Sequence, residues 1–359
     1  MFTLSEAIVN ATSAVARVAI HRRAEDAEEL LCGEGGGSED FLGLRIASIF
    51  IIMVGSMFGA LFPIFAKRSQ WLHVPTSVFD FAKYFGSGVV IATAFIHLLD
   101  PALKALESEC LSESWSEYPY ALSLCMASVL GIFVVELVAF RLGTARLAKL
   151  GLEHDAHGHA AGSHAAHGPE AGLEMSSTEK DEKQSLDVES GEIITDTVAA
   201  QIIGVGILEF GVILHSILIG LTLAVDEDFK TLFVVIVFHQ TFEGLGVGSR
   251  LAHLRLPSQY NWIPVCAGAL YGITTSIGIA AGLGVRTTYN PGSTTASIVS
   301  GVMDSISSGI LLYTGLVELL AHEFLFNREM QKASNGKLTY AIGCMILGWG
   351  LMALLGKWA

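Results

Sequence analysis

The sequence predicts an all-α integral membrane protein, built as a bundle of eight transmembrane helices. The chain has 359 residues, of which 52% are hydrophobic and 16% charged, and its mean hydropathy is +0.54. This composition is too apolar for an ordinary soluble domain. The apolar residues gather in eight segments of roughly 20 residues, the length that crosses a bilayer. These segments lack the alternating pattern of a membrane β-barrel.

The eight expected spans are separated by polar segments and are assigned by the length of each apolar run. In chain order they are Phe41–Phe65, Phe81–Leu106, Tyr120–Phe140, Val198–Val225, Leu232–Gly248, Trp262–Gly284, Ser297–Leu320 and Leu338–Leu355. Residues 41–142 thus hold the first three helices, residues 197–249 the fourth and fifth, and residues 250–359 the last three.

Charge in the connecting segments predicts the orientation. Lysine and arginine gather in four alternate connections, which we assign to the cytosol, whereas the intervening connections are acidic. An even number of spans then leaves both termini outside, including the extracellular amino-terminal tail, residues 1–40. Cys32 and Cys110 fall on this oxidising side, so a disulfide between them is one hypothesis and two free thiols the other. The net charge of -14 argues against nucleic-acid binding.

The segment 143–196 has the composition of a disordered cytosolic loop, because it contains few large apolar residues. Five histidines crowd into its first half, and imidazole is a common ligand for borderline metals. We predict a loose metal-binding segment; the alternative is a solvated linker. The histidines are His154, His157, His159, His164 and His167.

Ionisable residues within the fourth and fifth spans are the main functional signal, since charge is costly at membrane depth. His239 and Glu243 are four residues apart on one helix face, and His215 lies on the neighbouring span. Two imidazoles and a carboxylate suit zinc or ferrous iron. Ser216 could complete the shell, and Gln240 lies one step around the helix. The alternative is a set of interhelical hydrogen bonds.

Other polar residues within the spans suggest a route for the ion. His97 and Asp100 near the outer boundary look like an entrance, and Glu136, Asp304 and Glu318 could line the way through. Each could instead be an interface residue. At the inner end of the seventh span, His322 and Glu323 either take the ion on release or are simply solvated.

With these residues identified, the chain resembles the ZIP (Zrt/Irt-like) family, especially the fungal and plant plasma-membrane zinc and iron importers. The matching motifs are HSILIG from His215, FHQTFEGLGVGSR from Phe238, IHLLDPA in the second span and the histidine-bearing loop. The resemblance covers nearly the whole chain.

The resemblance implies an inverted 3+2+3 arrangement of helices, elevator-like motion, homodimers and inward transport of Zn²⁺ or Fe²⁺ at the plasma membrane. It places His215, Ser216, His239, Gln240 and Glu243 at the transport site. Some family members carry carboxylates where this chain has Ile219 and Gln240. We therefore expect one firmly held ion, transported as a substrate, with no catalytic cofactor.

Two other functions remain open from the sequence. An intramembrane metal-dependent hydrolase would also use helix-borne histidines and a carboxylate, but the chain lacks an HExxH motif. A non-conducting metal sensor would use the histidine loop without transport. Vesicle uptake separates these functions, because only a carrier accumulates zinc without an added substrate.

Overall fold

The computed structural model describes residues 32, 40–69, 74–149, 187–254, 256–290 and 292–358. Eight helical spans in these ranges are long and apolar enough to cross a membrane, which confirms the predicted fold class. They are formed by α2 (Leu42–Arg68); α3, η1 and α4 (Thr76–Ala92, Thr93–Leu99, Asp100–Leu106); α6 (Tyr120–Lys149); α7 (Asp187–Val225); α8 (Phe229–His253); α9 (Ile263–Val285); α10 and η4 (Thr294–Tyr313, Thr314–Phe326); and α12 (Asn335–Leu355). Short connecting helices are α5 (Glu113–Ser116), η3 (Ser258–Tyr260) and α11 (Arg328–Gln331).

Several spans extend beyond the apolar runs from which they were predicted. The second span begins at Thr76 rather than Phe81, and the seventh begins at Thr294 rather than Ser297. Hydropathy detects the apolar centre of a helix, whereas its ends depend on capping. At the seventh span, for example, the Ser293 side chain accepts a hydrogen bond from the Ala296 amide and so caps the helix.

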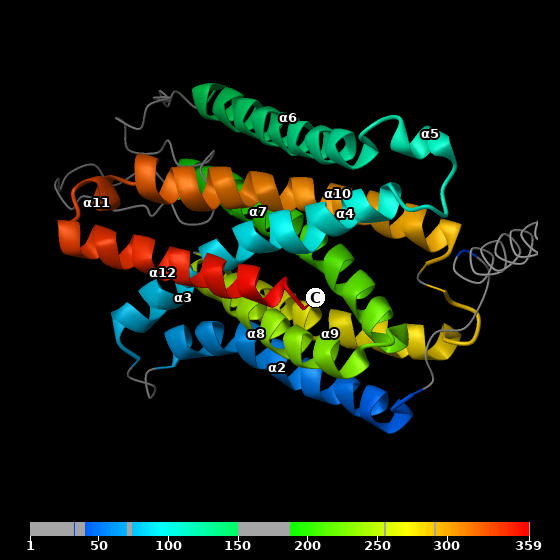
Figure 1. Ribbon diagram of the computed structural model, residues 1–359. Coiled ribbons are helices and arrows are strands. Elements are labelled where there is room, and N and C mark those ends of the chain that lie inside the picture. Colours follow the sequence, from blue (N-terminus) through cyan, green and yellow to red (C-terminus); the bar gives the residue numbers. More distant parts are fainter. Residues whose placement is uncertain are drawn as a thin grey trace, which may run out of the picture.

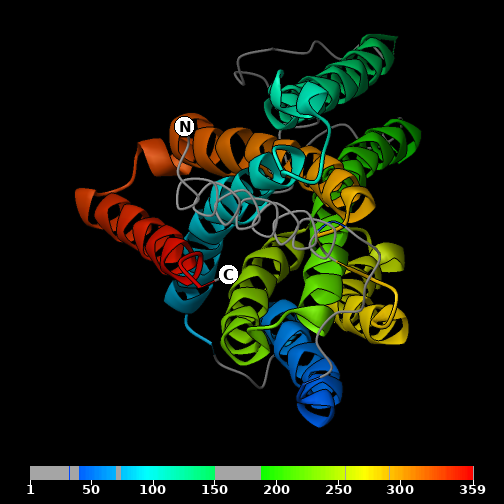
Figure 2. The same ribbon diagram turned by 45° about the vertical axis from the view of Figure 1, so that its right-hand side comes forward.

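The eight spans form two groups of four. The first group contains α2, α7, α8 and α9, which pack mainly against one another; the second contains the second span, α6, α10 with η4, and α12. Figures 1 and 2 show α2 along one edge of the molecule and α6 along the opposite edge. The groups meet where α3 packs on α8 and where α7 packs on α10.

Glycines let the helix backbones approach closely, as in other membrane bundles. Within the first group, a Cβ added to Gly248 would lie 2.2 Å from the Ala60 carbonyl oxygen. Between the groups, a Cβ added to Gly86 would lie 2.3 Å from the Gly246 Cα. The helix α8, which carries His239 and Glu243, is therefore in close backbone contact with α2 and with α3.

Two π-helical stretches interrupt the bundle, η1 in the second span and η4 in the seventh. These are the middle spans of the first and last triplets, which agrees with the inverted relation that the resemblance implies. Wider turns of this kind frequently occur at functional sites in helices. One of them, η1, contains His97.

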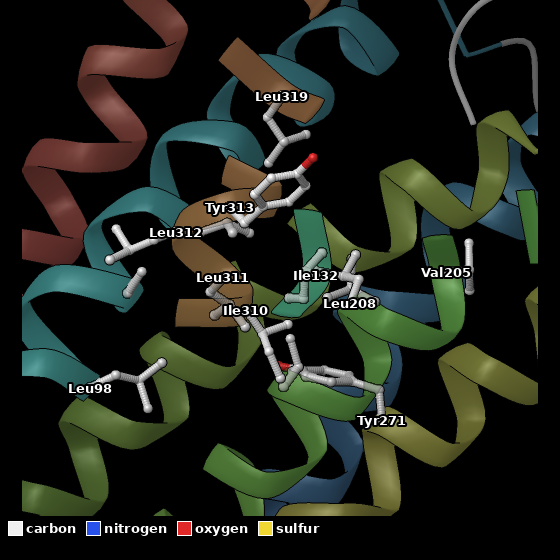
Figure 3. Close-up of a cluster of buried hydrophobic side chains, with 14 of the residues drawn as sticks. Leu98, Ile132, Val205, Leu208, Tyr271, Ile310, Leu311, Leu312, Tyr313 and Leu319 are labelled. Atoms are coloured by element: carbon white, nitrogen blue, oxygen red, sulfur yellow. The ribbon is translucent and has the colours of Figure 1, made fainter. Parts of the chain in front are cut away.

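An apolar cluster holds the two groups together between α7 and α10. Leu208 and Val212 of α7 pack there with Ile310 and Leu311 of α10, and the Tyr271 ring extends from α9 into the same cluster (Figure 3). These side chains are buried. They fix the position of α7, and with it His215.

Arg45 joins the start of α2 to the end of α7. Its guanidinium is fully buried and donates to the carbonyl oxygens of Leu223 and Ala224 at 3.1 and 3.0 Å, and to that of Asp226 at 2.7 Å. It also lies 4.5 Å from the centre of the Phe229 ring. The carbonyls at a helix end have no partner within the helix, so one side chain here satisfies the end of α7 and contacts the start of α8.

Candidate metal site

Three of the expected ligands come together inside the first group of helices. His215 of α7 and His239 and Glu243 of α8 each offer a ligand atom, and these atoms lie within 4.8 Å of one another. All three residues are buried. The spacing of four residues places His239 and Glu243 one helical turn apart on the face that meets α7.

The arrangement of ligand atoms suits a single borderline cation. The Nε2 atoms of His215 and His239 are 3.3 Å apart, and the Glu243 Oε2 lies 3.9 Å from the His239 Nε2. The other oxygen of Glu243 has no hydrogen-bond partner among the described residues. Two imidazole nitrogens and one carboxylate are a donor set for zinc or ferrous iron.

His97 adjoins this group from the second set of helices. Its ring lies edge-on to the His239 ring, with the centroids 4.6 Å apart. Its Nε2 is 2.9 Å from the Met352 carbonyl oxygen on α12. Because a carbonyl can only accept, Nε2 carries the proton and Nδ1 keeps its lone pair. The short distance between the two rings places His97 beside the three-ligand group, as expected for a residue on the approach.

Ser216 and Gln240 form a neighbouring polar cluster with Thr275 of α9. The Gln240 Nε2 donates to the Thr275 hydroxyl and lies 3.5 Å from the Ser216 Oγ. The amide nitrogen thus donates to these hydroxyls, whereas the amide oxygen is buried without a hydrogen-bond partner among the described residues. Ser216 and Gln240 thus lie next to the three-ligand group and join helices through hydrogen bonds, and their role at the ion stays a prediction.

The expected pathway residues lie in different surroundings. Asp100 is exposed and forms an ion pair with Lys104 at 2.6 Å. Glu136 accepts a hydrogen bond from the Tyr313 hydroxyl and interacts with Glu318.

Two further acidic residues of the seventh span are buried. Asp304 lies on α10, outside the three-ligand group. Near the carboxyl-terminal end of the span, Glu323 forms an ion pair with Lys83 of the second span at 2.8 Å. This pair shows that Glu323 is not simply solvated.

The remaining sequence predictions concern the tail and the long loop. The structure contains a disulfide between Cys32 and Cys110, with the Cα atoms 5.3 Å apart. The Cys110 carbonyl also accepts a hydrogen bond from the Thr294 hydroxyl at the start of α10. The five loop histidines lie outside the described residues.

The sequence reasoning missed two residues of α9 that contact the site. The Tyr271 hydroxyl donates to the Gln240 carbonyl oxygen at 2.7 Å and lies 3.4 Å from the Glu243 Oε2. Thr275 is one turn further along the helix. A signal was present, because two polar side chains four residues apart within an apolar span share one face.

The fold and the site together define a multi-pass membrane protein with a buried group of three side chains that could hold a metal ion. Its sequence is similar to the zinc-regulated transporter 1 of Saccharomyces cerevisiae, with 42% identity covering 90% of both chains. It is also similar to the zinc-regulated transporter 1 of Schizosaccharomyces pombe, at 39% identity covering 90% of this chain and 88% of that protein. Zinc transporter 3 of Arabidopsis thaliana is 34% identical, covering 91% and 89%.

The model of the ZIP zinc transporter family matches residues 42–356. The chain therefore belongs to the ZIP zinc transporter family, which confirms the resemblance inferred from the motifs. Members of this family are transporters and not enzymes, so the hydrolase alternative falls away. Zinc is the substrate that the protein carries across the membrane.

Proposed function

We propose that this protein imports Zn²⁺ into the cytosol and that His215, His239 and Glu243 hold the ion on its way. The observation that carries the proposal is the convergence of these three buried side chains within 4.8 Å. The names of the fungal and plant relatives favour zinc over iron as the main substrate.

A mixed shell of two imidazoles and one carboxylate fits the demands of transport. A transported ion must bind well enough to lose its water and weakly enough to leave. Both rings must be neutral and Glu243 ionised for the ion to bind. The single carboxylate leaves a Zn²⁺ complex with a net positive charge, which favours onward movement over permanent binding.

The site has the donors for one firmly held ion. Ile219, one turn beyond His215, offers no ligand atom, and Gln240 offers only an uncharged amide oxygen. A second ion beside the first would find no carboxylate at these two positions to balance its charge.

The proposed orientation of the chain rests on the distribution of charge, and the proposed direction and location of transport rest on the family resemblance. Positive residues in the connections favour extracellular termini and a cytosolic histidine loop, in which His154, His157, His159, His164 and His167 could bind zinc as it arrives. We further propose a homodimer in the plasma membrane, as the family resemblance implies. His97 and Asp100 would then lie at the outer side, and Glu136, Asp304 and Glu318 along the route.

Uptake by purified protein in liposomes tests the proposal. Vesicles that contain a zinc-sensitive dye should fill when the protein is present, and substitutions His215→Ala and Glu243→Ala should abolish filling without loss of folded protein. The matched control is His253→Gln, which removes a histidine from the end of the same helix α8, where its ring hydrogen-bonds Ser249. The proposal fails if wild-type vesicles stay empty, as a sensor would leave them, or if His215→Ala fills them normally.

A further inference from the structure

Glu209 of α7 is a buried acidic residue that does not belong to the three-ligand site. Its exposed fraction is 6%, and neither of its carboxylate oxygens has a hydrogen-bond partner within the described ranges. An ionised carboxylate without a partner is costly away from water. Such a group in a native protein calls for a physical explanation.

Glu209 belongs to a polar column that runs through the first group of helices. One layer of this column consists of Ser216, Gln240 and Thr275, which are joined by hydrogen bonds. Glu209 lies seven residues before Ser216 on the same face of α7, and Tyr271 lies four residues before Thr275 on α9. These two residues therefore form a second layer, here called the lower layer, which is nearer to the amino-terminal ends of α7 and α9 than the hydrogen-bonded layer is.

Glu243 connects this lower layer to the metal site. One of its oxygens is near both His239 and the Tyr271 hydroxyl, and the other is buried without a partner in the described part of the chain. Leu208 and Val212, which flank Glu209 on α7, pack in one apolar cluster with Tyr271, so this part of α7 lies against Tyr271, which in turn contacts Glu243. Glu209 is not among the groups that meet within 4.8 Å, so it lies one step beyond the first site.

We infer that Glu209 forms a second, weaker cation-binding position with Glu243 and the Tyr271 hydroxyl, to which Zn²⁺ passes from the three-ligand site before release. The inference rests on the proposed direction of transport, because it takes the start of α7 as the cytosolic side. Six residues of α helix separate Glu209 from His215, a rise of about 9 Å. The position offers only oxygen ligands, which bind zinc less tightly than imidazole does.

The surroundings of two other acidic residues within the spans strengthen this assignment. Glu136 has the Tyr313 hydroxyl as a donor, and Glu323 has the Lys83 ammonium. Those carboxylates have evident roles in joining helices. The two oxygens of Glu209 and the free oxygen of Glu243 lack such donors in the described segments, and a cation would satisfy them.

Zinc binding and zinc uptake by the purified full-length protein test the inference. The wild type should bind one tight and one weaker Zn²⁺, and Glu209→Gln, which keeps the shape and removes the charge, should bind only the tight one. His215→Ala should lose the tight ion instead. We expect Glu209→Gln to slow uptake about tenfold, and Glu209→Asp to recover part of the loss. The control Ser307→Ala removes a buried hydroxyl of α10 that lacks a partner among the described residues, and it should change neither measurement.

Two outcomes would overturn the inference while leaving the proposed function intact. One is a Glu209→Gln protein that binds as many zinc ions and imports them as fast as the wild type. The other is a Glu209→Asp protein that shows no partial recovery. If Glu209→Gln does not fold, the affinity of Glu209→Asp for the weaker Zn²⁺ is measured instead. An affinity equal to that of the wild type would contradict the inference. If the wild-type protein itself takes up no zinc, the proposed function is wrong instead.

Discussion

Replacing Arg45 by alanine should destabilise the junction between the end of α7 and the start of α8, the two helices that carry the expected metal ligands. The wild-type guanidinium makes two buried hydrogen bonds, to the Leu223 and Ala224 carbonyl oxygens, and a partly buried one to Asp226. Hydrogen bonds to a charged group contribute about 1.5–3 kcal/mol each. We count only the two buried bonds and the contact with the Phe229 ring, which is worth about 0.5–1 kcal/mol.

These contributions predict a loss of about 3.5–7 kcal/mol in the free energy of unfolding for Arg45→Ala. Unfolding of the purified protein in mixed micelles, followed by circular dichroism against denaturant concentration, measures the loss. Arg45→Lys keeps the charge without the planar fork of donors, so it should lose less. The matched control is Lys104→Ala, which breaks an exposed ion pair with Asp100 and should change stability little. If Arg45→Ala unfolds at the same denaturant concentration as Lys104→Ala, the reasoning is refuted.

Two further predictions concern ion pairs between helices. Lys83→Ala leaves Glu323 buried without its cation and should cost about 3–5 kcal/mol, whereas the apolar pair Lys83→Met with Glu323→Leu should recover most of that loss; a double variant as unstable as the single one would contradict this. Lys337 lowers the pKa of Glu329 below its usual value of 4.5, so this pair stabilises the fold at neutral pH and the contribution disappears as the pH falls through that lowered pKa. Unfolding curves of Glu329→Gln should therefore lack this part of the acid dependence, and a variant with the wild-type profile would show that the pair does not matter.

The spans and the main ligands could be predicted because their signals are local. An apolar run of sufficient length forms a helix in lipid whatever its neighbours are. His239 and Glu243 share a face through their spacing alone, and the short connection between α7 and α8 brings His215 near them. The three-ligand group therefore needed no knowledge of the overall packing.

The rest of the site depends on packing between segments that are far apart in the chain. Tyr271 and Thr275 reach Glu243 and Gln240 across 28 and 35 residues, and only the contact of α9 with its neighbours selects the face they present. Arg45 is more distant still, since it meets carbonyls 178 and 179 residues away. A backbone carbonyl carries no sequence signal, so this contact could not be predicted.

The position of Gln240 shows how the helix directs neighbouring residues of one motif to different sides. The resemblance placed it at the ion, next to His239 in the chain. On a helix, however, consecutive residues point about 100° apart, and the structure turns Gln240 toward α9 while His239 faces α7. Adjacent residues of one motif thus serve two different clusters.

The division of the bundle bears on how a bound ion could move. His215, His239 and Glu243 all belong to the first group of helices, so the ligand shell stays whole if that group shifts as a unit. His97 belongs to the second group and is held there by the Met352 carbonyl, yet its ring contacts that of His239. A shift of one group against the other would break this ring contact and leave the three ligands together. If the first group shifts as a unit, the three ligands therefore move together, and the contact between the two rings is the first to change.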